Sequence, residues 1–152
     1  MPDITLLEPL SAALHISVPE LLSGCTVENT NRASNLLRGR LYVCPVCGNV
    51  IQTRGEALIS CCGIILPALE AEYPDEAHAI QVEKSEDEYY ARVNHDMTRE
   101  HYISFIACVT ADRFDMKALY PEGGAEARFF RRGAGWLYWY CNRHGLYRQK
   151  LT

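Results

Sequence analysis

The sequence predicts a mainly β protein with a small metal-binding module and a short helical segment at its N-terminus. From residue 74 onward, short apolar or alternating runs are separated by Gly/Pro turns, which is typical of an antiparallel, immunoglobulin-like β-sandwich. Residues 41–73 hold two close cysteine pairs, a pattern that indicates a bound metal. Residues 3–23 have apolar side chains at helical spacing. We therefore predict a helical segment over 1–24, a linker over 25–40, a metal module over 41–73 and a sandwich over 74–152.

Composition narrows the function classes. The 152 residues carry a net charge of −4, so no basic excess favours nucleic-acid binding as the main activity. No apolar run is long enough to cross a bilayer, and the first residues lack the pattern of a secretory signal. The seven cysteines are odd in number and clustered, which favours metal-bound thiolates in a reducing compartment over disulfides. We expect a cytoplasmic protein without membrane association.

The helical segment carries clear end signals. Ser17 can cap a second helix, with Pro19 in its first turn, Glu20 three residues after the cap and Gly24 at its end. We expect His15 to lie at a helix end rather than to bind a metal. In the linker, residues 35–40 can form a helical turn, and Cys25 is expected to be a free thiol.

The sequence of this segment resembles the last helices of a helix-turn-helix regulator of the phage-repressor type. The stretches 2–7 and 14–22 carry the likeness, which covers only the last third of such a domain. The recognition helix would lie before Met1, so we expect no sequence-specific DNA binding from the chain as given. An amphipathic docking element is the favoured interpretation.

The metal module combines two thiolate pairs with glycines. The pairs are Cys44 with Cys47, and Cys61 with Cys62. Neighbouring cysteines cannot both point to one side of a regular strand, so Cys61 and Cys62 must lie in a turn. Gly48 and Gly63 follow the pairs and permit the positive φ that a chain wrapped around a metal needs. Four soft thiolates select iron or zinc.

The run Cys44-Pro-Val-Cys47-Gly48-Asn49, followed by Cys61-Cys62-Gly63, resembles desulforedoxin and the N-terminal domain of desulfoferrodoxin. The resemblance implies a rubredoxin-type iron centre that transfers electrons or supports the fold. Zinc could occupy the same thiolates and would end any redox role.

Alternation and turn residues predict the strands of the sandwich. The predicted strands cover residues 79–83, 89–93, 102–110, 113–119, 126–131 and 135–140. The first two form a hairpin around the turn at 85–88. Cys108 falls inside an apolar strand and is expected to be a buried small side chain.

Within this region, Cys141 and His144 lie three residues apart, close enough for one turn to aim both at one metal. His78, His95 and His101 lie upstream, so the region offers four imidazoles and one thiolate. Imidazole is a good ligand for ferrous iron, and a thiolate opposite an open position pushes electron density onto the metal. A small anion could be reduced at that position.

Three stretches resemble the superoxide reductase domain of the desulfoferrodoxin family: residues 76–78, 95–103 and 141–146. With the cysteine module, the likeness runs from about residue 42 to the end. It implies a catalytic iron bound equatorially by four histidines and axially by a cysteine, with a glutamate able to close the sixth position. These residues are His78, His95, His101, His144, Cys141 and Glu76. The implied reaction converts superoxide to hydrogen peroxide.

The resemblance also implies partners: an electron donor such as a rubredoxin-like protein, and a homodimer with the first module at its contact. One departure concerns the rate, because Ala77 stands where the family has a lysine that would attract superoxide. Our hypothesis is that Lys84, Arg99 or Arg143 supplies part of that field. Two alternatives remain open. One is a redox- or metal-sensing regulator, a truncated helix-turn-helix fusion, and the other is a zinc-stabilised binding module.

Overall fold

The computed structural model describes residues 3–28 and 35–152. Contacts divide the chain into two units, residues 1–32 and residues 33–152, and each unit is described by itself. Of the predicted linker over 25–40, residues 29–34 lie outside the described residues. The end of that linker forms the predicted helical turn, which is the 3-10 helix η2 at Leu36–Arg38.

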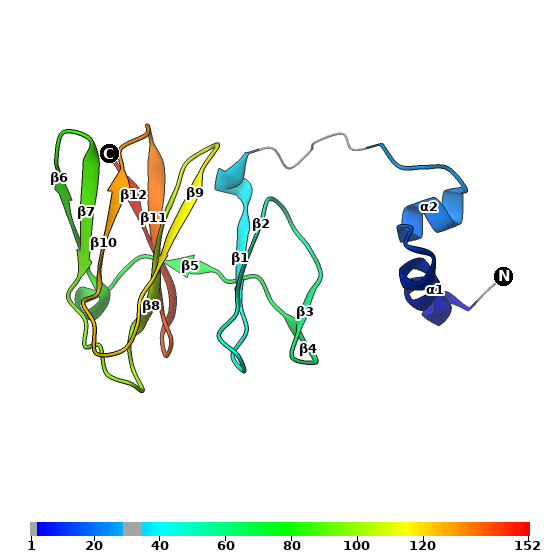
Figure 1. Ribbon diagram of the computed structural model, residues 1–152, viewed down its shortest axis with the longest axis horizontal. Coiled ribbons are helices and arrows are strands. Elements are labelled where there is room, and N and C mark those ends of the chain that lie inside the picture. The colour runs from blue at the N-terminus through cyan, green and yellow to red at the C-terminus, as the bar shows by residue number, and fades with distance from the viewer. Residues whose placement is uncertain (1–2, 29–34) are drawn as a thin grey trace. The chain divides into compact units, whose positions relative to one another are not determined.

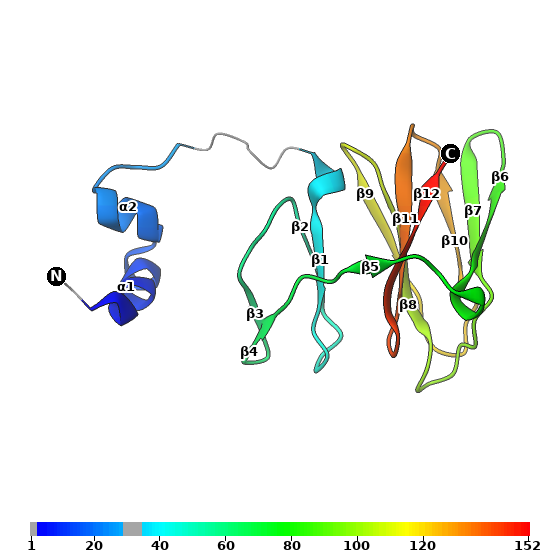
Figure 2. The ribbon, with the colours of Figure 1, turned by 180° about the vertical axis from the view of Figure 1, so that it is seen from behind.

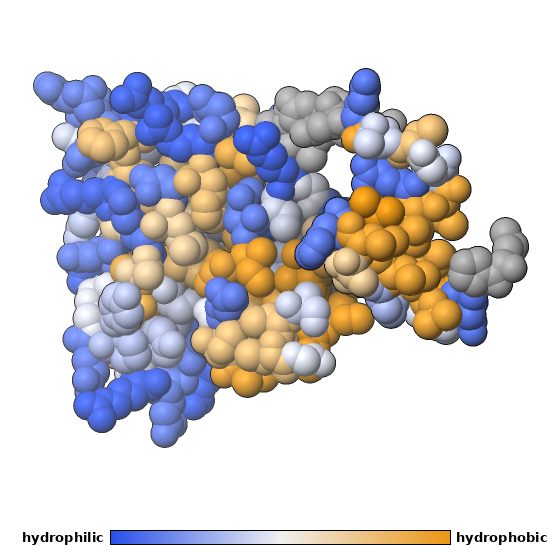
Figure 3. All heavy atoms as spheres, turned by 45° about the vertical axis from the view of Figure 1, so that its right-hand side comes forward, coloured by the Kyte–Doolittle hydropathy of each residue, from blue (hydrophilic) through white to orange (hydrophobic). Residues whose placement is uncertain are grey.

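The first unit consists of three short helical elements (Figure 1). They are the 3-10 helix η1 at Ile4–Leu6, α1 at Leu7–Leu14 and α2 at Val18–Ser23. None of their described side chains is buried, and Figure 3 shows much of this unit's surface as hydrophobic. The large exposed apolar residues are Ile4, Leu6, Leu10, Leu14, Ile16 and Leu22. Among the described residues, these helices therefore have no closed core of their own.

Local capping confirms the predicted helix ends. The Ser17 side chain accepts a hydrogen bond from the Glu20 backbone, and the Glu20 carboxylate accepts one from the Ser17 N–H at 2.8 Å. Gly24 ends α2 in the left-handed conformation, and His15 ends α1 with φ of 55°. Hydrogen bonds from Ser17 and Val27 lower the pKa of Glu20 to about 2. The capping box is thus the main local support of α2.

The second unit begins with two small hairpins. Strand β1 at Arg40–Val43 pairs with β2 at Val50–Thr53, and β3 at Ile59–Cys61 pairs with β4 at Ile64–Leu66. The turn between β3 and β4 consists of Cys62 and Gly63, with φ of 52° and 79°. Positive φ at both central residues is the geometry of a type I′ turn, which matches the twist of the strands. The structure therefore confirms the predicted turn at Cys62, whereas Cys61 is the last residue of β3.

The remaining strands form two sheets (Figures 1 and 2). One sheet has the order β10-β7-β6, with β6 at Ile80–Lys84, β7 at Glu88–Val93 and β10 at Glu126–Phe130. The other has the order β5-β12-β11-β8-β9. Its strands are β5 at Ala71–Glu72, β8 at Ile103–Val109, β9 at Phe114–Ala118, β11 at Gly135–Cys141 and β12 at Gly145–Leu151.

The mainly β fold and the six predicted sandwich strands are confirmed. Two strands of these two sheets were not predicted, namely β12 and the two-residue β5. The pair β5–β12 is parallel, whereas the other described pairs are antiparallel. Within the described residues, no helix has the length and apolar character needed to cross a membrane.

Two apolar clusters fix the sandwich and the module. The larger joins residues of both sheets around the fully buried Trp139, and β11 alternates strictly between buried and half-buried positions. The smaller cluster packs Leu41 of β1 against Phe105, Ala107 and Leu146 of the five-stranded sheet. Cys108 is buried as predicted. The cysteine module therefore rests on the same sheet that supplies Cys141, and both lie within one compact unit.

Candidate metal centres

The turn between β11 and β12 supplies two of the predicted donors. Cys141 ends β11 and pairs with Gly145, the first residue of β12, across a three-residue turn. Gly145 has φ of 94°, a conformation that side chains rarely adopt. The turn brings the Cys141 Sγ atom to 3.4 Å from the His144 Nδ1 atom. The sequence spacing that indicated a shared metal thus becomes a shared site.

The loop before β8 supplies two more donors, as predicted. His95 lies at its start and His101 at its end, two residues before β8. A turn closes the loop around Thr98, whose N–H donates to the His101 carbonyl at 2.9 Å and whose hydroxyl accepts from the His101 N–H at 3.1 Å. The His95 Nδ1 atom lies 2.5 Å from the Asp96 carbonyl oxygen, so it carries the proton and Nε2 is free to bind.

His78 lies in the segment that leads into the three-stranded sheet. It ends η3, a 3-10 helix at Glu76–His78 that precedes β6, and it is only 3% exposed. Its Nδ1 atom lies 2.6 Å from an Asp75 carboxylate oxygen, and its ring stacks on Tyr147 with centroids 4.5 Å apart. The Trp139 indole N–H donates to the His78 carbonyl at 3.0 Å. The hydrogen bond to His78 lowers the pKa of Asp75.

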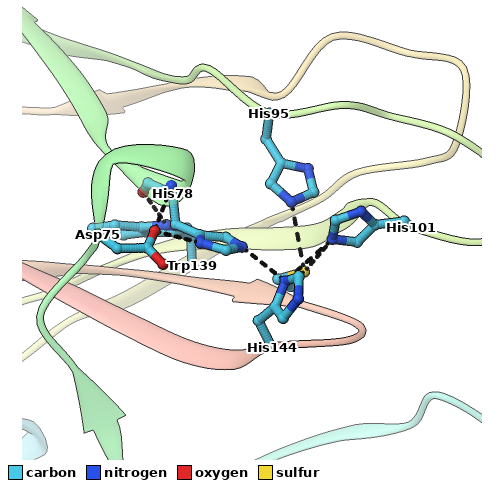
Figure 4. A network of polar contacts seen from close by, with 7 residues as sticks. Asp75, His78, His95, His101, Trp139 and His144 are labelled. Carbon is cyan, nitrogen blue, oxygen red and sulfur yellow. Dashed lines mark hydrogen bonds and ion pairs between the residues drawn. The ribbon is translucent and has the colours of Figure 1, made fainter.

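The four imidazoles form a closed ring (Figure 4). In the order His78, His144, His101, His95, each ring lies next to the following one, with centroid distances of 4.8, 4.9, 4.4 and 5.1 Å. The Cys141 Sγ atom contacts three of them, at 3.2 Å from His101 Nε2, 3.4 Å from His144 Nδ1 and 3.6 Å from His95 Nε2. Three of the four imidazoles thus meet at the Cys141 sulfur.

The donor spacing fits one enclosed ion. Two nitrogens each about 2.1 Å from a shared ion and at right angles lie about 3.0 Å apart. The structure places His78 Nε2 at 3.0 Å and His101 Nε2 at 3.2 Å from His144 Nδ1. All five donor atoms lie within 4.8 Å of one another. These short contacts between acceptor-type atoms are best understood as neighbouring corners of one coordination sphere, and a donor set of four imidazole nitrogens with one thiolate sulfur suits iron.

The side away from the sulfur is the accessible one. Cys141 is fully buried, whereas His95 and His101 are half-buried and His144 is exposed. Glu76 lies on η3 with an exposed side chain and does not belong to the five-donor group. The structure thus brings together every predicted donor of the second site, and it leaves the predicted glutamate at the margin.

Hydrogen bonds tie the two donor loops to each other. The Asn142 side chain accepts from the Tyr102 N–H at 2.9 Å and donates to the Glu100 carbonyl at 3.0 Å. The Arg143 guanidinium donates to the same carbonyl at 3.0 Å. Sequence reasoning missed Asp75 and Asn142 as supports. The only signal for Asp75 was an acidic residue in a helix N-cap position before a candidate ligand.

Burial and neighbouring imidazoles lower the pKa of two of the donors, His95 and His101. The pKa of His95 is lowered mainly by burial, and also by the neighbouring His78 and His144. The pKa of His101 is lowered by burial, then by the nearby histidines and by Arg143. A neutral imidazole is the form that binds metals, so these lowered pKa values favour metal binding by His95 and His101 at neutral pH.

The three proposed sources of positive charge differ in position. Arg143 lies in the donor turn, close enough to lower the pKa of His101, and contacts Glu100 at 3.4 Å. Arg99 lies in the donor loop and pairs with Glu122 at 3.2 Å. Lys84 ends β6, six residues beyond His78, and its Nζ atom donates to the carbonyl of Thr152 at 2.5 Å.

The four predicted cysteines of the module also converge. Cys44 and Cys47 lie on the knuckle after β1, where the Gly48 N–H donates to the Cys44 carbonyl at 2.9 Å. The Cys61 Sγ atom lies 3.6 Å from that of Cys47 and 3.9 Å from that of Cys62, and all four sulfurs lie within 4.8 Å. Sulfurs at tetrahedral corners about 2.3 Å from one ion lie about 3.8 Å apart. The donor set and its spacing therefore fit a tetrathiolate metal.

The thiols of this site are electrostatically coupled. Hydrogen bonds from the Cys47 backbone lower the pKa of Cys44 to about 7. Contacts with the Cys47 and Cys44 sulfurs raise the pKa of Cys61, and they raise that of Cys62 to about 12. Without a cation, the cluster thus retains protons that a bound metal must displace. All seven cysteines of the chain are free thiols.

Comparison with known proteins gives three informative likenesses. A desulfoferrodoxin of Clostridium acetobutylicum is 39% identical over 59 residues, which are 39% of this chain and 47% of that relative. A desulfoferrodoxin of Desulfarculus baarsii is 29% identical over 117 residues, covering 71% of this chain and 93% of the relative. No family model matches the chain.

Among solved structures, the superoxide reductase from Treponema pallidum superposes with a TM-score of 0.67 and 23% identity. The superposition covers 75% of this chain and 99% of the other. At this identity the likeness establishes the fold. The first sequence match spans less than half of its relative's length, whereas the second spans nearly all of it. The chain is thus similar in sequence to desulfoferrodoxins and similar in fold to a superoxide reductase.

Proposed function

We propose that this protein is a superoxide reductase, an oxidoreductase that converts superoxide to hydrogen peroxide. The observation that carries the proposal is the ring of four imidazoles with the Cys141 sulfur beside it, in which Cys141 is buried and His144 is exposed. In this proposal His78, His95, His101, His144 and Cys141 hold one iron. A ferrous ion bound there would supply one electron to superoxide, which needs two protons as well to become hydrogen peroxide.

The chain's own residues set the conditions for that reaction. Cys141 is fully buried, so the sandwich keeps water away from its sulfur, which would donate electron density to a bound iron. The hydrogen bonds at His78 Nδ1 and His95 Nδ1 hold the protons on those atoms, so that both Nε2 atoms face inward. Arg143 places positive charge beside His101, where an anion would approach. Glu76 is proposed to act at the open face.

The cysteine module is proposed to hold a second metal. Cys44, Cys47, Cys61 and Cys62 offer the donor set of a rubredoxin-type iron, which would transfer electrons or support the fold. Zinc in the same thiolates would leave only the supporting role. A rubredoxin-like electron donor, a homodimer and a cytoplasmic location complete the proposal, together with the domain division at residues 24, 40 and 73.

A second candidate function rests on the helical unit. Its exposed apolar residues and well-formed capping box suit a docking element, which favours a regulator whose iron centre senses redox state or metal supply. This chain would then consume superoxide slowly or not at all, while still binding iron. A zinc-stabilised binding module would hold zinc at the cysteine site and no iron at the histidine site.

Metal quantification of protein purified without air, with superoxide consumption assayed on the same sample, separates these functions. If the protein is a superoxide reductase, we expect iron at the histidine site and stoichiometric or catalytic loss of superoxide. Bound iron without superoxide consumption would favour the sensing regulator. Zinc alone, with visible spectra free of iron–thiolate absorption, would favour the binding module.

A further inference from the structure

The Asp75 carboxylate contacts the candidate ligand His78 at Nδ1, the ring nitrogen that does not face the other donors. An Asp75 oxygen accepts the His78 backbone N–H at 2.9 Å and lies 2.6 Å from the His78 Nδ1 atom (Figure 4). The first contact caps η3. The second contact, with the His78 Nδ1 atom, is not part of the helix cap. A single oxygen therefore serves both the backbone and the imidazole.

The imidazole in this contact is firmly held. The His78 side chain is only 4% exposed, while that of Asp75 is 63% exposed. The stacked Tyr147 ring fixes the plane of the imidazole, and the bond from Trp139 to the His78 carbonyl fixes its backbone. The Nε2 atom then points at the other donors, 3.0 Å from His144 Nδ1. The carboxylate thus touches a ring that has no room to turn away.

The other imidazoles are treated differently. The Nδ1 atom of His95 also has an acceptor, but it is the neutral backbone carbonyl of Asp96. Among the described residues, only His78 has a carboxylate bonded to its outer ring nitrogen within the five-donor group. A carboxylate in that position makes the metal-bound nitrogen more basic and adds negative charge to the site.

We propose that Asp75 is a positioning residue that fixes the His78 tautomer and lowers the redox potential of the metal held by the five donors. The proposal rests on the proposed function, because it assumes an iron at that site. Added negative charge favours the ferric form over the ferrous form, so removing it should raise the midpoint potential. The effect acts through His78 and requires no contact between Asp75 and the substrate.

The test compares three variants of the iron-loaded full chain. Asp75→Asn keeps a neutral oxygen that can cap η3 and accept from Nδ1, whereas Asp75→Ala removes both contacts. Glu83→Gln, on an exposed position of β6 and five residues after His78, removes one negative charge at a residue that is not a candidate ligand. The readouts are the midpoint potential of the histidine-site iron and the rate at which a chelator removes that iron.

We expect Asp75→Ala to release iron roughly tenfold faster, the lower end of what supporting residues contribute. If its ferric affinity falls about tenfold relative to its ferrous affinity, the midpoint rises by about 59 mV. Asp75→Asn should shift the potential in the same direction by a smaller amount, and Glu83→Gln should match the unaltered chain.

Two results would overturn the proposal. Unchanged potentials in both Asp75 variants would show that the carboxylate does not tune the metal. A shift in Asp75→Ala alone, with Asp75→Asn equal to the unaltered chain, would show that the negative charge of Asp75 does not lower the potential. If the unaltered chain binds iron and consumes superoxide in either case, the proposed function survives. If it binds no iron at the histidine site, both proposals fall together.

Discussion

The two candidate metal centres of this chain are built in contrasting ways. In the five-donor centre, Cys141 and His78 are buried and each donor loop is tied by hydrogen bonds to its neighbour. In the cysteine centre only Cys44 is buried, while Cys47 and Cys62 are exposed on tight turns. The first centre is therefore arranged by the packed sandwich, whereas the second has a small apolar cluster around Cys44 and Cys61 and two thiols on exposed turns.

The donor atoms differ in charge as well as in support. Neutral imidazoles with lowered pKa values need to lose no proton when a cation binds. The thiols of Cys61 and Cys62, with raised pKa values, must each release one. The two centres thus differ in how many protons a metal must displace when it binds. Four predictions test this difference between the centres.

The largest effect is expected from Cys141→Ser. Replacing the one thiolate of the five-donor centre removes its strongest electron donor, so superoxide turnover should fall by more than about 100-fold. The matched control is Cys108→Ala, which removes a buried thiol from the neighbouring strand β8 and should leave turnover near that of the unaltered chain. Turnover with superoxide on iron-quantified samples measures both. Equal activity in Cys141→Ser would remove the thiolate from the mechanism.

The next effect is a difference in pH dependence. Cys61 and Cys62 hold their protons at neutral pH, and zinc must displace both. Each displaced proton raises the zinc affinity about tenfold per pH unit, so the two together should raise it roughly a hundredfold per pH unit. At the other centre the lowered pKa values of His95 and His101 add no such slope, and Cys141 is the one thiol among the five donors, so the slope there should be smaller. On acidification, metal should therefore leave the cysteine centre first.

Competition with a zinc chelator between about pH 6.5 and 8.0 would measure these slopes. Cys61→Ala removes one of the titrating thiols and should flatten the slope of the cysteine centre alone. Equal slopes at the two centres would contradict this difference in the number of displaced protons.

A smaller effect on metal affinity is expected when the hydrogen bonds between the two donor loops are removed. In Asn142→Ala, the bonds to Tyr102 and Glu100 are lost while every donor atom stays. Metal affinity of the five-donor centre should fall about tenfold, and the cysteine centre should keep its affinity. Titration with Co²⁺, followed by the separate absorption bands of the two centres, would resolve them. A loss at both centres would mean that the turn supports the whole unit.

The smallest effect concerns attraction of the anion. Ala77 is exposed on η3, beside His78, so Ala77→Lys would add a positive charge near the open face. Two charges about 10 Å apart in water interact by about 0.4 kcal/mol, which is roughly a twofold gain in rate. Stopped-flow rates at low and high salt should show the gain at low salt only. A gain that persists at high salt would point to a local effect other than steering.

Local patterns predicted much of this fold. Alternation predicted strands such as β7 and β11, the Ser17 and Glu20 pair predicted the capping box, and adjacent Cys61 and Cys62 predicted a turn. Each of these signals lies within a few residues of the structure that it predicts. The donors of the five-donor centre were predicted from a family resemblance, and the structure brings those five residues together.

Features set by tertiary contacts were not predictable in the same way. Strand β12 reads Gly-Leu-Tyr-Arg-Gln-Lys-Leu, without clean alternation, and is held by pairing with β11 and β5. Strand β5 has only two residues, so it has no pattern of its own. The role of Asp75 depends on the direction of the His78 ring, which Tyr147 fixes from a strand far along the chain. No periodicity in the sequence encodes such a contact.

Product stoichiometry tests the central claim most directly, because it asks whether the histidine-site iron reduces superoxide. Protein reduced in the absence of air would be mixed with a known amount of superoxide, and hydrogen peroxide and dioxygen would be measured together. The account predicts one hydrogen peroxide for each superoxide consumed, no dioxygen, and oxidation of one iron at the five-donor centre. Dioxygen and peroxide in equal amounts, or superoxide that persists beside a fully reduced iron, would contradict it.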